Sequence, residues 1–185
     1  MGALDMGLKE EELGPLVKAW REANPAIVDF WWDVDKAVKN SIKARLPQKT
    51  HGLIFIVQSG ILFITLPSKR RLAYVKPKII IDESGIEKIT YEGVGEAKKW
   101  ERIESYGPKF VENIVQGTAR DILCNSINNL SEYDIVMHVH DEVIIDAPIS
   151  LTCDEVISLM TKNPSWCEDL CLKADGYECS FYQKD

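Results

Sequence analysis

The stretch Met137-His138-Val139-His140-Asp141-Glu142-Val143-Ile144-Ile145-Asp146 places neighbouring ionisable residues between two apolar runs. Apolar residues occupy every second position on both sides of it: Ile135, Met137 and Val139 before, and Val143, Ile145 and Ala147 after. This period of two is typical of strands with one buried face. Since both apolar sets fall on odd numbers, Val139 is expected to pair with Val143, which leaves 140–142 as a three-residue hairpin loop. A two-residue loop would pair Val139 with Glu142 and mix the two faces, so the register argument disfavours it.

Two carboxylates, Asp141 and Glu142, stand side by side at the tip of this expected hairpin. Hard cations such as Mg²⁺ prefer oxygen ligands, so the pair is a candidate metal site. An acidic turn that simply faces water is the structural alternative. A second metal alternative uses His138 and His140, which point the same way if they lie on one strand. The third histidine, His51, is far away in sequence, so that set has no obvious further ligand.

The composition is that of an ordinary globular protein. The chain has 185 residues, of which 45% are hydrophobic and 28% charged, enough for one unit with a real core. Lys and Arg number 22 against 29 Asp and Glu, a net charge of −7. This negative net charge argues against nonspecific binding to nucleic acid, although the chain can still have a local basic groove.

The five cysteines are odd in number and contain no Cys-x-x-Cys spacing, which favours reduced thiols. A zinc site at Cys167, Cys171 and Cys179 is disfavoured because no histidine lies near them. No apolar stretch approaches the ~20 residues of a membrane span. Charged residues interrupt the N-terminal stretch, so no signal peptide is expected and the cytoplasm is the expected location.

The periodicity along the chain predicts an α+β fold with an antiparallel sheet in one unit. Helices are expected at 9–22, 25–45, 110–130 and 152–160, the second opened by Asn24-Pro25 and the fourth capped by Thr152. Strands are expected at 53–57, 61–66, 74–75, 79–81, 86–92 and 170–177, in addition to the hairpin. Residues 96–104 are expected to lead into the long third helix.

Two sets of polar side chains outside the hairpin are candidates for contact with a large anion. One side of the expected helix 110–130 and its approach is polar, with Lys109, Glu112 or Asn113, Gln116 and Arg120. The densest positive cluster comprises Lys69, Arg70, Arg71, Lys76 and Lys78. Such clusters are usually solvated, but they also suit a phosphate backbone.

Two motifs in fixed order carry a resemblance to a known family. Gln116-Gly117-Thr118-Ala119-Arg120-Asp121-Ile122, followed about twenty residues later by Val139-His140-Asp141-Glu142, resembles the C-terminal part of family A DNA polymerases. The flanks resemble the phage and prophage branch: Leu66-Pro67-Ser68, Arg71-Leu72, Lys98-Lys99-Trp100, Tyr106-Gly107-Pro108-Lys109, Glu112-Asn113 and Ala174-Asp175-Gly176-Tyr177. The resemblance implies that 1–48 is the helical end of the fingers and 49–185 the palm, with the motif C hairpin packed on a long helix.

The resemblance also implies residue roles. Asp141 would be the motif C aspartate that binds catalytic Mg²⁺, with Glu142 as its acidic partner. The DNA-binding residues would be His140, Gln116, Asn113, Arg120 and Lys109, acting on primer–template DNA in an enzyme that also binds dNTPs. Where the broader family usually has Asn one turn before the glutamine, this chain has Glu112 with Asn113 beside it.

The most important departure from the family is a missing carboxylate. Two-metal phosphoryl transfer needs oxygen ligands from two places, and no Asp-Tyr-Ser-like strand lies upstream of Asp141. The expectation is therefore a C-terminal polymerase fragment that is inactive alone, with an open sheet edge that invites self-association. The alternatives are a non-catalytic DNA-binding remnant, one subunit of a split polymerase, or an unrelated metal hydrolase that uses His138, His140 and Asp141.

Overall fold

The computed structural model describes residues 7–182, and the chain forms two compact units. The first unit takes in the described part of Met1–Thr65 together with Arg71–Asn113, and the second takes in Leu66–Arg70 and the described part of Ile114–Asp185. The division falls within the long helix α3 (Gly107–Asn129) and not near residue 48. The assignment of 1–185 to one part of a polymerase domain stays a prediction.

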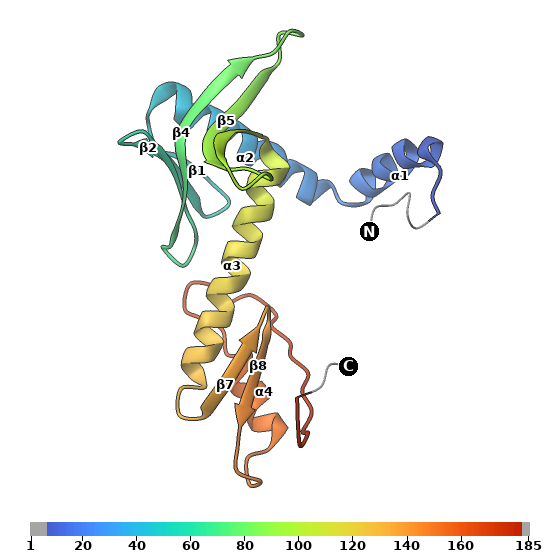
Figure 1. Ribbon diagram of the computed structural model, residues 1–185, viewed down its shortest axis with the longest axis vertical. Coiled ribbons are helices and arrows are strands. Elements are labelled where there is room, and N and C mark those ends of the chain that lie inside the picture. Colours follow the sequence, from blue (N-terminus) through green and yellow to red (C-terminus); the bar gives the residue numbers. More distant parts are fainter. Residues whose placement is uncertain (1–6, 183–185) are drawn as a thin grey trace. The chain divides into compact units, whose positions relative to one another are not determined.

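The first unit is built on an antiparallel sheet with the strand order β1-β2-β3-β4-β5-β6 (Figure 1). Its strands are β1 Gln48–Thr50, β2 Leu53–Gln58, β3 Ile61–Thr65, β4 Arg71–Ile81, β5 Glu87–Val94 and β6 Trp100–Ser105. Each strand pairs with the next along the chain, so the sheet is a simple meander. In the described residues the fold is α+β, with four helices, this six-stranded sheet and a separate hairpin, which confirms the expected class.

Two helices precede the sheet: α1 (Glu10–Ala23) and α2 (Pro25–Ala44). Pro25 occupies the first turn of α2, as expected, because its missing N–H and its fixed φ cost nothing there. Asn24 stands at the cap position, but its side chain donates to the carbonyl of Trp20 instead of capping α2. The helix α2 contacts β1, β2 and β4, so it covers one face of the sheet.

The core of the first unit lies between α2, the start of α3 and the inner face of the sheet. Its fully buried apolar residues alternate along the strands and recur at helical spacing, and they include Val34, Val38, Phe55, Leu62, Ile64, Ile89 and Phe110. The carboxylate of Asp35, on α2, accepts a hydrogen bond from the backbone N–H of Gly107 at 3.0 Å. This contact satisfies an orphan donor at the start of α3.

The second unit contains the rest of α3, the hairpin β7 (Asp134–Val139) and β8 (Glu142–Asp146), and α4 (Cys153–Met160). Side chains of α3 donate to carbonyls at and just beyond the end of α4: Ser126 to Met160, Asn129 to Leu159 and Asn125 to Lys162. The predicted cap of α4 is confirmed, because Thr152 accepts from the Glu155 N–H and the Glu155 carboxylate accepts from the Thr152 N–H.

Several predictions about strands were wrong. Residues 74–81 belong to one long strand, β4, with an irregular register between Val75 and Lys78 where Pro77 has no N–H to donate. Strand β6 was missed because it is held by pairing with β5 and by charged side chains, not by an apolar alternation. Residues 170–177 form no strand; in the described part of the chain no strand pairs with them, and Asn163 instead donates to the carbonyl of Leu170.

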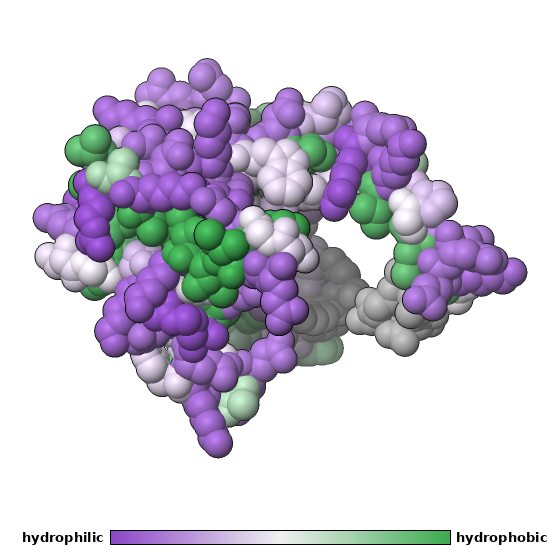
Figure 2. All heavy atoms as spheres, turned by 90° about the horizontal axis from the view of Figure 1, so that it is seen from above, coloured by the Kyte–Doolittle hydropathy of each residue, from purple (hydrophilic) through white to green (hydrophobic). Residues whose placement is uncertain are grey.

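The hairpin β7–β8 also differs from expectation, because it forms its own two-stranded sheet and is not part of the six-stranded one. The surface seen in Figure 2 is mainly hydrophilic, with hydrophobic side chains gathered in patches, as the 28% of charged residues would suggest. Within residues 7–182, no helix combines the length and the apolar character that crossing a membrane requires.

Candidate functional site

The hairpin tip has a shorter loop than the sequence predicted. Val139 pairs with Glu142, so His140 and Asp141 alone form the turn, and His140 takes a positive φ of 52°. Toward the base the register shifts by one residue, since Ile135 pairs with Ile145 whereas Met137 pairs with Ile144. Val136 is the extra residue of this β-bulge.

The register prediction failed because it assumed a buried face. Every residue of β7 and β8 is exposed or half-buried, so mixing the two faces near the tip costs little. On the other side of the bulge at Val136, Ile135 pairs with Ile145, so residues with odd numbers again lie opposite each other, as the sequence predicted. The tip is therefore a short turn, with His140 and Asp141 both exposed, on a hairpin without a fully buried residue.

The carboxylates of the tip are free to bind a ligand. Asp141 is exposed and Glu142 is half-buried, and neither forms an ion pair or a side-chain hydrogen bond with the described residues. Their oxygen atoms are suitable donors for Mg²⁺, which usually takes one or two protein carboxylates and fills its remaining positions with water and substrate oxygens. Within residues 7–182, however, no group of three or more His, Cys, Asp or Glu could hold a metal ion. The tip thus fits part of a metal site and not a whole one.

The same observation removes support from the hydrolase alternative. His138 and His140 are both exposed, and the described residues do not join them with Asp141 in a cluster suited to a metal. A hydrolytic metal centre at these three residues would therefore lack the ligands that it needs.

The four candidate DNA-binding residues of α3 fall into two groups. Gln116 and Arg120 are exposed and make no side-chain hydrogen bond or ion pair with the described residues. Lys109 pairs with Glu112 at 2.7 Å, and the hydrogen bond to this carboxylate raises the pKa of the lysine. Asn113 donates to the Tyr74 hydroxyl at 3.0 Å. Gln116 and Arg120 are therefore available to a ligand, whereas Lys109 and Asn113 already have partners.

Tyr74 ties Asn113 into the core of the first unit. Its ring meets those of Tyr91 and Phe110 edge-on, each with centroids 5.0 Å apart. Burial of the hydroxyl raises the pKa of Tyr74 to about 12, although the hydrogen bond from Asn113 opposes the shift. The amide of Asn113 therefore has a structural task beside any contact with DNA.

One contact that the sequence analysis missed joins two of its motifs. The side chain of Arg70 donates to Asp121 Oδ1 at 2.6 Å and to the carbonyl of Gly117 at 2.7 Å. Ser68 donates to the other carboxylate oxygen of Asp121. Residues 66–70 are thereby held on the Gln116–Ile122 segment of α3. Each segment is recognisable in the sequence, but no local pattern shows that two segments about fifty residues apart meet.

The predicted positive cluster is only partly available for phosphate. Arg70 is paired with Asp121, and Lys76 is paired with Glu92 at 2.8 Å. Arg71 lies over the ring of Phe63, 5.6 Å from its centroid. Lys69 and Lys78 have no ion pair with the residues that the structure describes.

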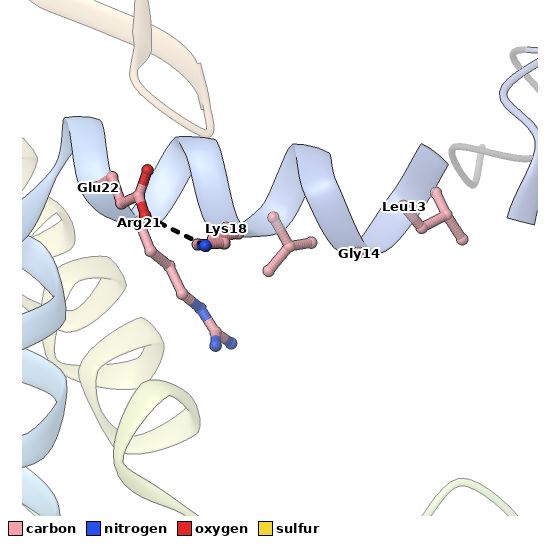
Figure 3. A pocket seen from close by; sticks show the side chains of 6 residues that line it. Leu13, Gly14, Lys18, Arg21 and Glu22 are labelled. Carbon is pink, nitrogen blue, oxygen red and sulfur yellow. Dashed lines mark ion pairs between the residues drawn. The ribbon is translucent and has the colours of Figure 1, made fainter. Parts of the chain in front are cut away.

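A hollow on the surface of α1 is unrelated to this chemistry (Figure 3). It is lined by residues of that one helix: Leu13, Gly14, Val17, Lys18, Arg21 and Glu22. Lys18 and Glu22 form an ion pair at 3.9 Å across two exposed side chains. Such a surface pair contributes little to stability and offers no enclosed site.

Comparison with known proteins gives one strong sequence match. No family model matches the chain, and no solved structure matches it significantly. Over 190 aligned residues the chain is 52% identical to the DNA polymerase of Bacillus phage SP02, and the alignment covers the whole chain but 29% of the length of that polymerase. The chain is therefore homologous, from end to end, to a segment of a phage DNA polymerase.

Proposed function

We propose that this chain supplies the helical end of the fingers and the palm segment with motif C of a family A DNA polymerase of the phage branch. The observation that carries the proposal is the 52% identity along the whole chain to a phage DNA polymerase of which it spans 29%. The ordered motifs at Gln116–Ile122 and Val139–Glu142 support the assignment to family A. The activity proposed is template-directed nucleotidyl transfer by the larger assembly, with primer–template DNA and dNTPs as its substrates.

Asp141 and Glu142 are the proposed catalytic and metal-binding residues. They would hold Mg²⁺ together with a carboxylate from another part of the polymerase, since the residues 7–182 offer no third ligand nearby. Bound Mg²⁺ would neutralise charge on the transferring phosphate and activate the primer hydroxyl. The exposure of Asp141 at a two-residue turn supports this role, because nothing in the hairpin blocks the approach of the missing partner.

The other proposed roles concern DNA. Gln116 would donate an amide hydrogen bond to minor-groove acceptors, which all base pairs share, so that the contact checks shape without reading sequence. Arg120 would contact phosphate, and His140 would lie near the primer end. Lys109 and Asn113 are weaker candidates, because each must give up or share its present partner.

A chimeric polymerase tests the proposal. The matching 29% of the phage SP02 enzyme is replaced by this chain, and primer extension is measured with Mg²⁺ and dNTPs. We expect extension by the chimera, none by the isolated chain, and loss of at least about a thousandfold on Asp141→Ala, because a metal-binding carboxylate acts in the transition state.

Asp146→Ala is the matched control, since Asp146 is another exposed carboxylate at the far end of β8. It should extend primers at close to the parent rate. Robust synthesis by the Asp141→Ala chimera, or by the isolated chain, would refute the proposal.

A second candidate is one subunit of a split polymerase, which agrees equally well with the lack of a third ligand near Asp141 and Glu142 among residues 7–182. In that case the chain and the complementary segment, expressed separately and mixed, should extend primers without being fused. A chain that binds primer–template DNA but never supports extension in either format would instead be a non-catalytic DNA-binding remnant.

A further inference from the structure

The six-stranded sheet has a second face, which we call the outer sheet face. The helix α2 covers the inner face, on which Phe55 and Leu62 are buried. Because side chains alternate along a strand, the intervening residues point to the other side. They include Ile54, Ile56, Ile61, Phe63 and Val75, all of which are partly exposed. The outer face therefore has an apolar centre that is open to a ligand.

The register extends this face to the edge strand β6. Ile61 pairs with Val75, Val75 pairs with Glu92, and Glu92 pairs with Arg102, so these four residues form one row across the strands. Trp100 lies two residues from Arg102 and thus on the same face. Phe63 is placed on this face in the same way, two residues from Ile61.

Trp100 is both accessible and held in place. Its side chain is 60% exposed, a large fraction for an indole ring. Its Nε1–H donates to Glu92 Oε2 at 3.3 Å, and Arg102 holds the other oxygen of that carboxylate at 3.1 Å. The ring is thus anchored by its edge and requires little further ordering when a flat ligand stacks on it.

Four cations without ion-pair partners among the described residues belong to the strands and the turn that carry these aromatic rings. Arg71 lies over the ring of Phe63. Lys78 on β4 is the register partner of Thr90, two residues from Glu92 on β5. Lys98 and Lys99 precede Trp100 in the β5–β6 turn. None of these four has an ion pair with the residues that the structure describes, whereas Lys76, Lys88 and Arg102 on the same strands do. Glu96 in the turn and Glu101, whose carboxylate lies beside Gly95 of the same turn, offset two of these four charges, which leaves a positive excess on a chain of net charge −7.

We propose that the outer sheet face binds single-stranded DNA. A base would stack on Trp100, and phosphates would lie against Lys98, Lys99 and Lys78. An aromatic platform combined with unpaired cations is the arrangement that binds unpaired strands, whose bases are free to stack on a side chain. In a duplex the bases already stack on one another, so Trp100 has no base face to meet. The inference rests on the proposed polymerase function, in which the strand would be the single-stranded template.

Binding of a labelled oligonucleotide tests this face on the intact chain. Fluorescence anisotropy with a fluorescein-labelled thymidine 12-mer at low salt should give saturable binding, with a duplex of the same length binding at least tenfold more weakly. Trp100→Ala should weaken binding about tenfold, because the ring on which one base stacks is removed, and Trp100→Phe should recover part of that affinity. Lys98→Gln with Lys99→Gln should lower the salt dependence of log K by roughly 1.4, about 0.7 for each phosphate that is no longer neutralised.

Trp32→Ala is the matched control. Trp32 is 54% exposed, similar to Trp100, but it lies on α2 and not on the outer sheet face. Its replacement should leave oligonucleotide binding unchanged. Circular dichroism checks that each variant is folded, which we expect because both side chains are mostly exposed.

The proposal is overturned if the chain does not bind the 12-mer, if Trp100→Ala binds as the parent does, or if Trp32→Ala loses as much affinity. A dimer of the chain that excludes the oligonucleotide, seen by light scattering, would also overturn it and would identify a second copy as the occupant. Oligonucleotide binding needs no catalysis, so this proposal and the polymerase assignment can fail separately: the chimera can lose primer extension while the isolated chain still binds the 12-mer.

Discussion

The carboxylate of Asp35 joins the backbone N–H of Gly107 at 3.0 Å and the ammonium of Lys39 at 2.7 Å. Only 12% of the Asp35 side chain is exposed, so both contacts are shielded from water. One residue of α2 therefore holds the start of α3, although 72 positions separate it from Gly107.

Asp35→Ala should destabilise the chain by about 1–3 kcal/mol, because it leaves a buried N–H without an acceptor and Lys39 without its partner. Asp35→Asn, which keeps an acceptor, should cost less. Urea unfolding followed by circular dichroism measures both. Asp33→Ala is the control, since Asp33 is exposed and, among residues 7–182, pairs with His51 alone. Equal losses for the variants at Asp33 and Asp35 would contradict the capping role.

Gly107→Ala should destabilise the first unit through a clash with backbone. A Cβ at this position would lie 2.2 Å from the Trp31 carbonyl oxygen, so α2 and α3 would have to separate. Overpacking of this kind costs about 1–3 kcal/mol. Gly95→Ala is matched to it, because the three atoms nearest to its Cβ would all belong to the flexible side chain of Glu101. Thermal unfolding should show a clearly lower melting temperature for Gly107→Ala alone, and similar values for the two variants would count against the clash.

Breaking the pair between Arg70 and Asp121 should loosen residues 66–70. Asp121 is nearly buried and accepts from Arg70 and Ser68, so Asp121→Ala leaves two donors without an acceptor. Hydrogen exchange of amides 68–70 should accelerate in Asp121→Ala and in Arg70→Ala. The double mutant should accelerate exchange by less than the sum of the two single effects, because both single changes remove the pair between Arg70 and Asp121. Fully additive acceleration would indicate that the two residues act independently.

The stability of α4 should fall in acid. Hydrogen bonds from the Thr152 N–H and hydroxyl lower the pKa of Glu155 below its ordinary value of 4.5. A carboxyl with a depressed folded pKa stabilises the fold fully above its unfolded pKa, and this contribution is lost as the pH falls through the lower folded value. Glu155→Gln should flatten the pH dependence of α4 amide exchange below about pH 4.5. Asp154→Asn is the control, since this neighbouring carboxylate accepts no side-chain hydrogen bond from the described residues.

Local signals in the sequence predicted most of the helices. Pro25 begins α2, Thr152 caps α4, and the apolar spacing of 110–130 marks α3, because each of these effects acts over a few neighbouring residues. The turn between β2 and β3 was also expected from Gln58-Ser59-Gly60, and Ser59 and Gly60 both have positive φ there. The position of Asp141 at a hairpin tip was likewise predictable, since both runs beside it favour strands, whereas Glu142 is the first residue of β8 and not part of the loop.

Contacts between distant segments could not be predicted in this way. Strand β6 forms because it pairs with β5. Residues 170–177 form no strand, because no strand of the described chain pairs with them. The loop of the β7–β8 hairpin is short because no residue of β7 or β8 is fully buried. Asp35 with Gly107, and Arg70 with Asp121, meet only after the chain has folded. The sequence by itself determined which segments are helices, which tip carries the carboxylates and which polymerases the chain resembles, since propensity, capping and motif order act locally. Only the tertiary structure decided the register of the strands, the hydrogen-bond partners of distant residues and which cations have no ion pair. These depend on which surfaces come together and how much water they exclude.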